Sequence, residues 1–159
     1  MSLTDTDTRF LREAIRLASE SVAAGGGPFG AVIVRDGEVL ARAANRVTLD
    51  HDPTAHAEVR AIRLACDRLA SHDLTGATLY ASCEPCPMCL GAIYWARISR
   101  LVYAASKDDA ARAGFDDAFI YRELALDPTC RSLPSARGLA GEGREPFERW
   151  TEKADRCEY

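Results

Sequence analysis

Apolar residues recur at three- and four-residue intervals in two stretches of the chain, residues 7–24 and 56–69. This spacing places the apolar side chains on one face of a helix, and it therefore predicts two amphipathic helices. Three consecutive glycines, 25–27, end the first helix. Pro53 and Thr54 precede the second, as is typical of a helix start.

Four short apolar runs have the length of β-strands. They span residues 30–35, 38–44, 77–82 and 100–105. The first two flank Asp36-Gly37, a pair that favours a two-residue hairpin turn, so we expect them to pair antiparallel. A further helix is expected at 86–97, with Pro87 in its first turn. This alternation indicates an α/β fold in which helices cover a mixed sheet.

The last third of the chain has a weaker pattern. A short helix is expected after Asp116, and residues 127–146 are rich in Pro, Gly, Ser and Arg, which indicates an irregular connection. A last amphipathic segment at 145–157 is expected to bury Phe147 and Trp150. We expect residues 1–159 to form a single domain, because this length suits one core.

Composition and charge narrow the class of protein. Hydrophobic residues make up 47% of the chain and charged residues 28%, as in an ordinary globular protein. The N-terminal residues are acidic and polar, and no stretch approaches the ~20 apolar residues of a membrane span, so a cytoplasmic protein is expected. The formal net charge of −4 disfavours nucleic acid as the main partner.

In a reducing compartment, the six cysteines indicate metal-binding or catalytic thiols rather than disulfides. Cys86 and Cys89 are three residues apart at a predicted helix start, where both sulfurs lie on one face and thiol pKa values are lowered. His56 stands at the start of the other helix. Two thiolates and one imidazole suit zinc and leave a fourth position for water, which is typical of a catalytic site.

Glu58 follows His56 by two residues and cannot share its direction around the helix. We therefore expect its carboxylate beside the metal rather than on it. Hydrolytic removal of an amino group needs such a proton shuttle, because the leaving nitrogen must be protonated. The alternative is a closed structural zinc site with His51 or Cys83 as fourth ligand, which would leave Glu58 without a role.

The combination His56-Ala57-Glu58 with Pro85-Cys86-Pro87-Met88-Cys89 is the known signature of zinc deaminases. The chain resembles the cytidine-deaminase-like superfamily and, within it, the small bacterial guanine deaminases. The similar segments are Gly-Gly-Pro-Phe-Gly-Ala-Val-Ile-Val at 26–34, Asp-Pro-Thr-Ala-His-Ala-Glu-Val at 52–59, the stretch from Ser82 to Arg97, Ala-Gly-Phe-Asp-Asp-Ala-Phe-Ile-Tyr at 113–121 and the closing Glu-Tyr. Residues 124–146 match nothing in that family.

The resemblance implies a three-layer α/β/α fold around a mixed five-stranded sheet, and a homodimer that could exchange its C-terminal segments. It implies one Zn2+ per subunit, bound by His56, Cys86 and Cys89, with Glu58 as the catalytic residue. The implied reaction is the hydrolysis of guanine to xanthine and ammonia.

The resemblance also implies the contacts with a nucleobase. Asn45 matches a base-contacting asparagine, although turn residues are often Asn as well. Asp117 matches an acidic substrate contact, and a carboxylate suits the ring N–H of a free base; Asp116 or Asp117 could instead cap a helix. Tyr159 ends a segment, 145–159, that is expected to close over the site. Phe29 and Trp95 could stack on the base or pack in the core.

Three other functions fit parts of the pattern. A tRNA adenosine deaminase shares the segment at 51–58, but the acidic balance and the absence of a basic C-terminal helix disfavour it. Deaminases of cytosine, guanosine or amino-triazines would use the same chemistry in a differently shaped pocket. A non-enzymatic zinc domain is the last alternative, and the intact Glu58 disfavours it.

Overall fold

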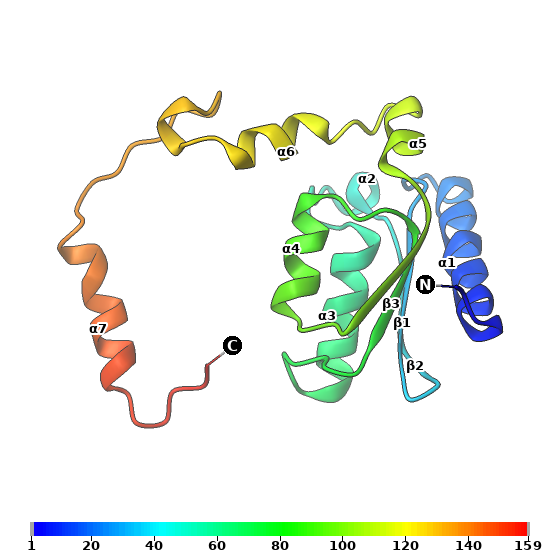
Figure 1. The fold of residues 1–159 in the computed structure, drawn as a ribbon, viewed down its shortest axis with the longest axis horizontal. Helices are drawn as coiled ribbons and strands as arrows, with labels where there is room; N and C mark the ends of the chain where they lie inside the picture. The colour runs from blue at the N-terminus through cyan, green and yellow to red at the C-terminus, as the bar shows by residue number, and fades with distance from the viewer. Residues whose placement is uncertain (1, 159) are drawn as a thin grey trace. The chain divides into compact units, whose positions relative to one another are not determined.

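A computed structural model describes residues 2–158 (Figure 1). These residues divide into two compact units, one that extends to Asp117 and one that begins at Ala118. The two units are described separately below. In the described part of the chain, no helix combines the length and the hydropathy that crossing a membrane requires.

The first unit is built on a four-stranded mixed sheet. Its strands are β1 (Gly30–Arg35), β2 (Glu38–Ala44), β3 (Thr78–Cys83) and β4 (Arg100–Ala105), in the order β2-β1-β3-β4. Strand β1 pairs antiparallel with β2 and with β3, whereas β3 and β4 are parallel. The four strands confirm the four apolar runs of the sequence.

The expectation of a fifth strand is wrong for the described residues, because the sheet ends at β4. After β4 the chain forms helix α5 (Lys107–Arg112) and then the segment 113–117, in which Gly114 has a φ of 94° and two aspartates follow Phe115. Residues of this kind are poor strand formers. The chain then enters helix α6 (Ala118–Ala125), as the sequence predicted for the residues after Asp116.

The hairpin between β1 and β2 turns where the sequence predicted it. Asp36 and Gly37 have φ values of 52° and 78°, and such positive values give the turn a twist that matches the paired strands. The register shifts between Ile33 and Val34, so that β2 carries one extra residue there.

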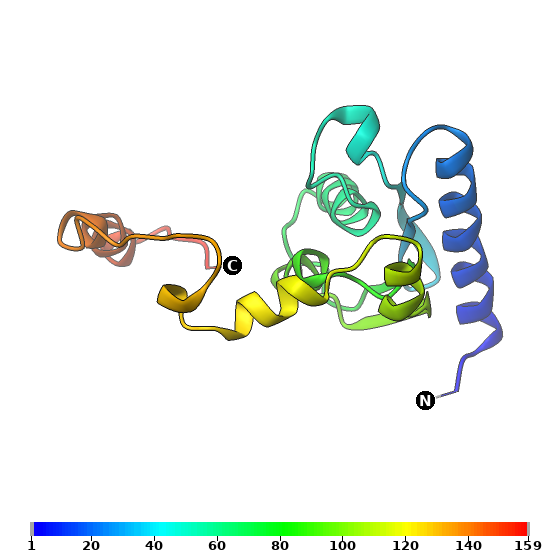
Figure 2. The ribbon, with the colours of Figure 1, turned by 90° about the horizontal axis from the view of Figure 1, so that it is seen from above.

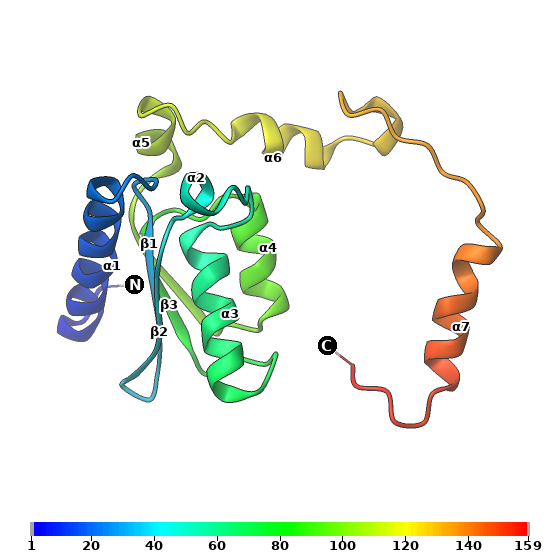
Figure 3. The same cartoon turned by 180° about the vertical axis from the view of Figure 1, so that it is seen from behind.

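Helices cover both faces of this sheet. Helix α1 (Asp5–Ala23) lies on one face, and α3 (Ala57–Leu69) and α4 (Pro87–Trp95) lie on the other, as all three views show (Figures 1, 2 and 3). A single short turn, α2 (Val47–Asp50), follows β2. The three-layer α/β/α arrangement is therefore confirmed for this unit.

Alternation along β1 divides the core into two clusters. Ala31 and Ile33 are fully buried in the cluster that includes residues of α3 and α4, while Val32 and Val34 pack with Phe10 and its neighbours from α1. Successive side chains of a strand point to opposite faces, so a strand covered on both sides carries apolar residues at every position. This explains why the sequence of β1 shows no alternation with polar residues.

Helix α1 begins two residues earlier than the apolar stripe predicted, because Thr4 caps it. The Thr4 side chain accepts a hydrogen bond from the backbone N–H of Asp7, and the Asp7 carboxylate accepts one from the backbone N–H of Thr4. The same carboxylate accepts hydrogen bonds from Tyr80 at 2.8 Å and from both terminal nitrogens of Arg100 at 2.5 and 2.9 Å. A partly buried ion pair thus connects α1 to β4, and the hydrogen bond from Tyr80 connects α1 to β3.

The second unit consists of short helices and extended connections. Its helices are α6, the 3-10 turns η1 (Pro128–Cys130) and η2 (Glu142–Arg144), and α7 (Glu145–Glu152). No residue from 118 to 158 is buried. The expected burial of Phe147 and Trp150 is wrong in the chain as described, since these side chains are 71% and 37% exposed. This unit has no core of its own.

Candidate active site

The starts of α3 and α4 bring together the three residues expected to bind zinc. His56 is the N-cap of α3 and has an extended backbone, with ψ of 150°. Cys86 is the N-cap of α4, and Pro87 occupies the first turn of that helix. Because β3 runs through Glu84 and Pro85 into α4, this site lies at the carboxyl end of β3, the edge of an open α/β sheet where ligands usually bind.

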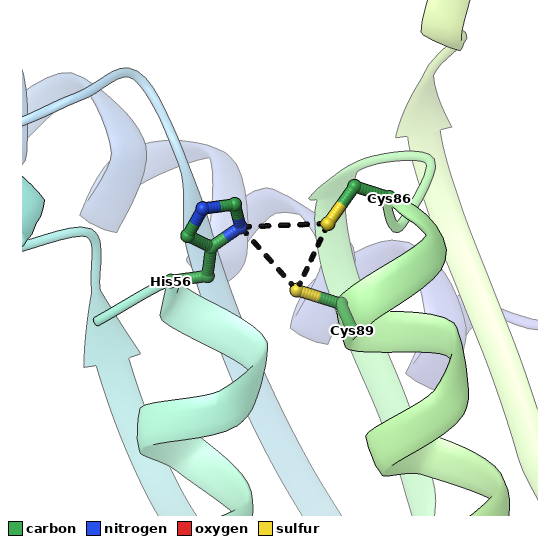
Figure 4. A group of neighbouring side chains, drawn as sticks. All are labelled: His56, Cys86 and Cys89. Carbon is green, nitrogen blue, oxygen red and sulfur yellow. Dashed lines mark hydrogen bonds between the residues drawn. The ribbon is translucent and has the colours of Figure 1, made fainter. Parts of the chain in front are cut away.

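The geometry of this cluster fits a zinc ion. The Nδ1 atom of His56 lies 3.6 Å from Sγ of Cys86 and 3.5 Å from Sγ of Cys89, and the two sulfurs are 3.6 Å apart (Figure 4). Tetrahedral zinc with ordinary Zn–S and Zn–N bonds places its sulfurs about 3.8 Å apart and nitrogen and sulfur about 3.6 Å apart. The residues are therefore arranged as zinc ligands.

A fourth protein ligand is absent from the cluster. Within residues 2–158, His56, Cys86 and Cys89 form a group whose ligand atoms all lie within 4.8 Å of one another, and no fourth His, Cys, Asp or Glu belongs to it. Of the two alternatives considered, His51 ends helix α2, and the Cys83 thiol donates to the carbonyl of Ser106 at 3.5 Å. Three ligands leave one position open, which is the arrangement of catalytic zinc sites.

The protonation of the three side chains is coupled. A hydrogen bond with Cys89, and then one with His56, lowers the pKa of Cys86 to about 4. The pKa of Cys89 is raised by its hydrogen bond with Cys86 and by burial, and the pKa of His56 is raised by its hydrogen bond with Cys86. The three side chains thus share protons with one another. A cation bound between Nδ1 of His56 and the two cysteine sulfurs would replace these protons.

Glu58 lies beside this cluster and is not part of it. Its side chain belongs to the first turn of α3 and is 5% exposed. Burial raises the pKa of its carboxyl, and the neighbouring Cys86 acts in the same direction, while His56 and Cys89 lower it. A buried carboxyl group next to an open metal position can take up and release protons out of contact with bulk water.

Asn45 directly follows β2 and is 6% exposed. Its Oδ1 atom accepts hydrogen bonds from the backbone N–H groups of Gly27 at 3.3 Å and Val47 at 3.2 Å. The bond with Val47 has the spacing of a turn stabilised by an asparagine side chain. Asn45 is thus a turn residue, and the same two hydrogen bonds hold its carboxamide in a fixed position.

Asp117 is half-buried near the metal ligands. Burial raises the pKa of its carboxyl, and the neighbouring Cys86 adds to this effect. Asp117 thus lies within electrostatic reach of Cys86 but outside the group of three ligands, while Asp116 beside it is exposed. Phe29 packs against the core and also meets Phe115 edge to face, with ring centroids 5.0 Å apart.

Two other expected contacts stay predictions. Trp95 is the last residue of helix α4 and is 67% exposed, so it is not a core residue of this unit. Its expected stacking on the base is not tested by this exposure. Tyr159 lies outside the described residues.

The sequence did not single out the residues that surround Asn45. The Ser21 hydroxyl donates to the Asn45 carbonyl at 3.0 Å, and Gly26 and Gly27 pass so close to Asn45 that a Cβ on either would overlap it. The run of three glycines was the available signal, but a helix end and a resemblance to the family do not show that Gly26 and Gly27 approach Asn45.

A three-layer α/β unit with an open His-Cys-Cys site and a buried glutamate has the architecture of a zinc-dependent deaminase. The sequence profile of the cytidine and deoxycytidylate deaminase zinc-binding region matches residues 4–105, nearly the whole first unit. This chain belongs to that family.

The similarity to relatives extends beyond that region and covers most of the chain. The expectation that residues 124–146 match nothing in the family is therefore wrong. A guanine deaminase from Bacillus subtilis is 54% identical over 151 residues, which make up 94% of this chain and 97% of the relative. A crystal structure of guanine deaminase from Bacillus subtilis aligns with 99% of each chain, at 51% identity and a TM-score of 0.93. A tRNA-specific adenosine deaminase from Agrobacterium fabrum is 45% identical over 116 residues, which cover 71% of this chain and 72% of the relative.

Proposed function

We propose that this protein is a guanine deaminase, which converts guanine and water to xanthine and ammonia. The observation that carries the proposal is the placement of the buried Glu58 carboxyl beside three side chains spaced as zinc ligands. The similarity to the Bacillus subtilis guanine deaminase over 94% of the chain supports guanine as the substrate.

His56, Cys86 and Cys89 would hold the metal. A zinc ion held there would make hydroxide available from water near neutral pH. Glu58 takes one proton from the attacking water and passes it to the ring nitrogen next to the carbon that carries the amino group. It then delivers the second proton to the amino nitrogen, and the C–N bond breaks to release ammonia.

In the proposed contacts with guanine, Asn45 donates a hydrogen bond to the base and Asp117 accepts one from it. The Oδ1 atom of Asn45 already accepts two backbone hydrogen bonds, so its NH2 group is the part suited to an acceptor on the base. The Asp117 carboxylate is suited to a ring N–H, and a free base has such a group where a nucleoside carries its sugar. The edge-to-face contact of Phe29 with Phe115, two residues before Asp117, supports an aromatic wall near this carboxylate.

The assembly is also part of the proposal. We expect a cytoplasmic homodimer in which residues 145–159, with Tyr159, close over an active site, either in the same subunit or in the partner. The lack of any buried residue from 118 to 158 supports this, because such a segment gains stability only by packing on another surface. The single deaminase domain expected from the sequence would then include both units.

Deamination of adenosine in tRNA is the main alternative. The similarity to the Agrobacterium enzyme covers 71% of this chain, compared with 94% for the guanine deaminase. A net charge of −4 gives no general attraction to a phosphate backbone. Both observations favour a small base.

The test is ammonia release by the zinc-loaded protein with guanine, guanosine, cytosine, adenine and tRNA in parallel. A clear preference for guanine is expected. A preference for another member of the panel would overturn the assignment of guanine and leave the zinc chemistry in place. No ammonia from any of them, with zinc bound, would overturn the proposal that the protein is an enzyme.

A further inference from the structure

Four hydrogen bonds hold Asn45, two through its main chain and two through its side chain. Its backbone N–H donates to the carbonyl of Phe29 at 2.9 Å, and its carbonyl accepts from Ser21 at 3.0 Å. Its Oδ1 atom accepts from the backbone N–H groups of Gly27 and Val47. Both the main chain and the carboxamide of this buried residue are therefore fixed.

These bonds determine which way the carboxamide points. The oxygen and nitrogen of an asparagine amide are distinguished by their partners, and two backbone N–H groups can be satisfied only by an oxygen. The NH2 group must then point away from both donors. Before any base binds, the amide is set to donate a hydrogen bond and not to accept one.

Gly27 has no side chain, and the Asn45 carboxamide occupies the space that a side chain there would need. A Cβ at this position would lie 2.9 Å from Oδ1 and 3.0 Å from Cγ of Asn45, and its three nearest neighbours would all be atoms of that carboxamide. Gly27 is not among the residues with positive φ, so the backbone itself would accept an alanine. What a side chain would disturb is the orientation of Asn45.

We propose that Gly27 is a positioning residue, which holds the Asn45 carboxamide so that its NH2 group donates to an acceptor atom of the base. The proposal rests on the proposed function for the identity of the base. Gly27, which lies in the segment after α1, would thus take part in substrate recognition. Asn45 would donate a hydrogen bond to the base and would not accept one from it.

A double-mutant cycle tests whether Gly27 acts through Asn45. In Gly27→Ala, kcat/KM for guanine is expected to fall about 10- to 100-fold, as for other small displacements of a positioning group. In the Asn45→Ala background, the added methyl group has no carboxamide to displace, so Gly27→Ala should cause no further loss. Losses that multiply in the double variant would overturn the proposal, because a purely structural effect is independent of Asn45.

Gly91→Ala is the matched control. Gly91 lies in α4, and a Cβ there would meet no atom within 4 Å. This variant should keep the kcat/KM of the wild type, and all variants should keep their zinc content. Asn45→Ala should lower the melting temperature, because it leaves the backbone N–H groups of Gly27 and Val47 without their acceptor.

A measurement without substrate separates this proposal from the proposed function. The side-chain amide resonances of Asn45 in an 15N-labelled protein, assigned by their loss in Asn45→Ala, should shift in Gly27→Ala and stay in place in Gly91→Ala. Unchanged resonances in Gly27→Ala would overturn the positioning role, whichever base is the substrate. If the resonances shift but the wild type releases no ammonia from guanine, the proposed function fails, and the recognition of guanine by Asn45 fails with it.

Discussion

Glu58 stands two residues after His56, and the two side chains are close enough to shift each other's pKa in opposite directions. His56 precedes α3 with an extended backbone, whereas Glu58 lies inside the first turn of that helix. The break in conformation between them lets the imidazole point at the two cysteine sulfurs while the carboxyl lies to one side. One short motif thus supplies both a metal ligand and an acid–base group.

Replacing Glu58 with Gln should remove the proton shuttle and keep the site. The side chains have nearly the same shape, so zinc content and melting temperature should be retained. Turnover of guanine should fall by about two to four orders of magnitude, the usual contribution of acid–base catalysis. Ammonia release and elemental analysis measure the two effects. Glu20→Gln, at an exposed position of α1, is the control and should be fully active. Near-normal activity in Glu58→Gln would refute the mechanism.

Replacing Cys86 or Cys89 with Ser should abolish zinc binding, because a hydroxyl is a far weaker ligand for zinc than a thiolate. Elemental analysis of the purified variants should find much less than one zinc per chain. Cys130→Ser changes an exposed thiol of the second unit and should keep the metal. One zinc per chain in both site variants would show that these ligands are wrongly assigned.

The strands and the helices of the first unit could be predicted because their signals are local. The apolar run at 77–82 became β3 (Thr78–Cys83), and the expected helix at 86–97 became α4 (Pro87–Trp95). The fifth strand came from the resemblance alone, and no apolar run in the sequence supported it. The core alternative for Trp95 is wrong, because periodicity alone cannot show that α4 leaves this residue exposed.

The metal ligands could be predicted because each belongs to a motif of fixed spacing. Gly27 could not, because its role depends on a contact with a residue 18 positions away in the sequence. No local pattern distinguishes a glycine that makes room for a distant side chain from one that ends a helix. The pairing of Asp7 with Arg100 was missed for the same reason, since 93 positions separate the two residues.

Asn45→Asp should separate the turn role of this residue from its role toward the base. A carboxylate can accept the same two hydrogen bonds from Gly27 and Val47, so the turn should be kept. The buried charge has no cationic partner in these bonds, so the melting temperature should fall somewhat. The carboxylate has no NH2 group, however, and kcat/KM for guanine should fall at least about 10-fold. Thermal unfolding and ammonia kinetics measure the two effects. A fully active Asn45→Asp would show that the asparagine serves only the turn.

Asp7→Asn should destabilise the first unit, and the loss should depend on pH. The hydrogen bonds from Arg100, followed by those from Thr4 and Tyr80, hold the pKa of Asp7 well below its usual value. The folded protein therefore gains stability from the charged carboxylate above about pH 4, and loses it as the pH falls toward the lowered pKa. At pH 7 the variant should be about 2 to 3 kcal/mol less stable, because the buried carboxylate of Asp7 loses its charge and its ion pair with the partly exposed Arg100.

Denaturant unfolding at pH 7 and at about pH 3 measures this dependence. The difference between the wild type and Asp7→Asn should shrink at the lower pH. Asp5→Asn, at an exposed position in the same helical turn, should differ little from the wild type at either pH. A constant difference between the wild type and Asp7→Asn would mean that the charge of Asp7 does not contribute to stability.

Asp117→Asn and Asp116→Asn decide which of two neighbouring carboxylates meets the base. Asp117 is half-buried near Cys86, and Asp116 is exposed. An amide at position 117 accepts a ring N–H less strongly than a charged carboxylate does, so kcat/KM for guanine should fall by about 10-fold or more. The loss should be mainly in KM, since this contact binds the substrate in both the ground state and the transition state. Asp116→Asn should stay within about 2-fold of the wild type.

If Asp116→Asn loses activity and Asp117→Asn keeps it, the contact belongs to Asp116 and the half-buried carboxyl has another role. Equal and small effects in both variants would show that no carboxylate of this segment binds the base.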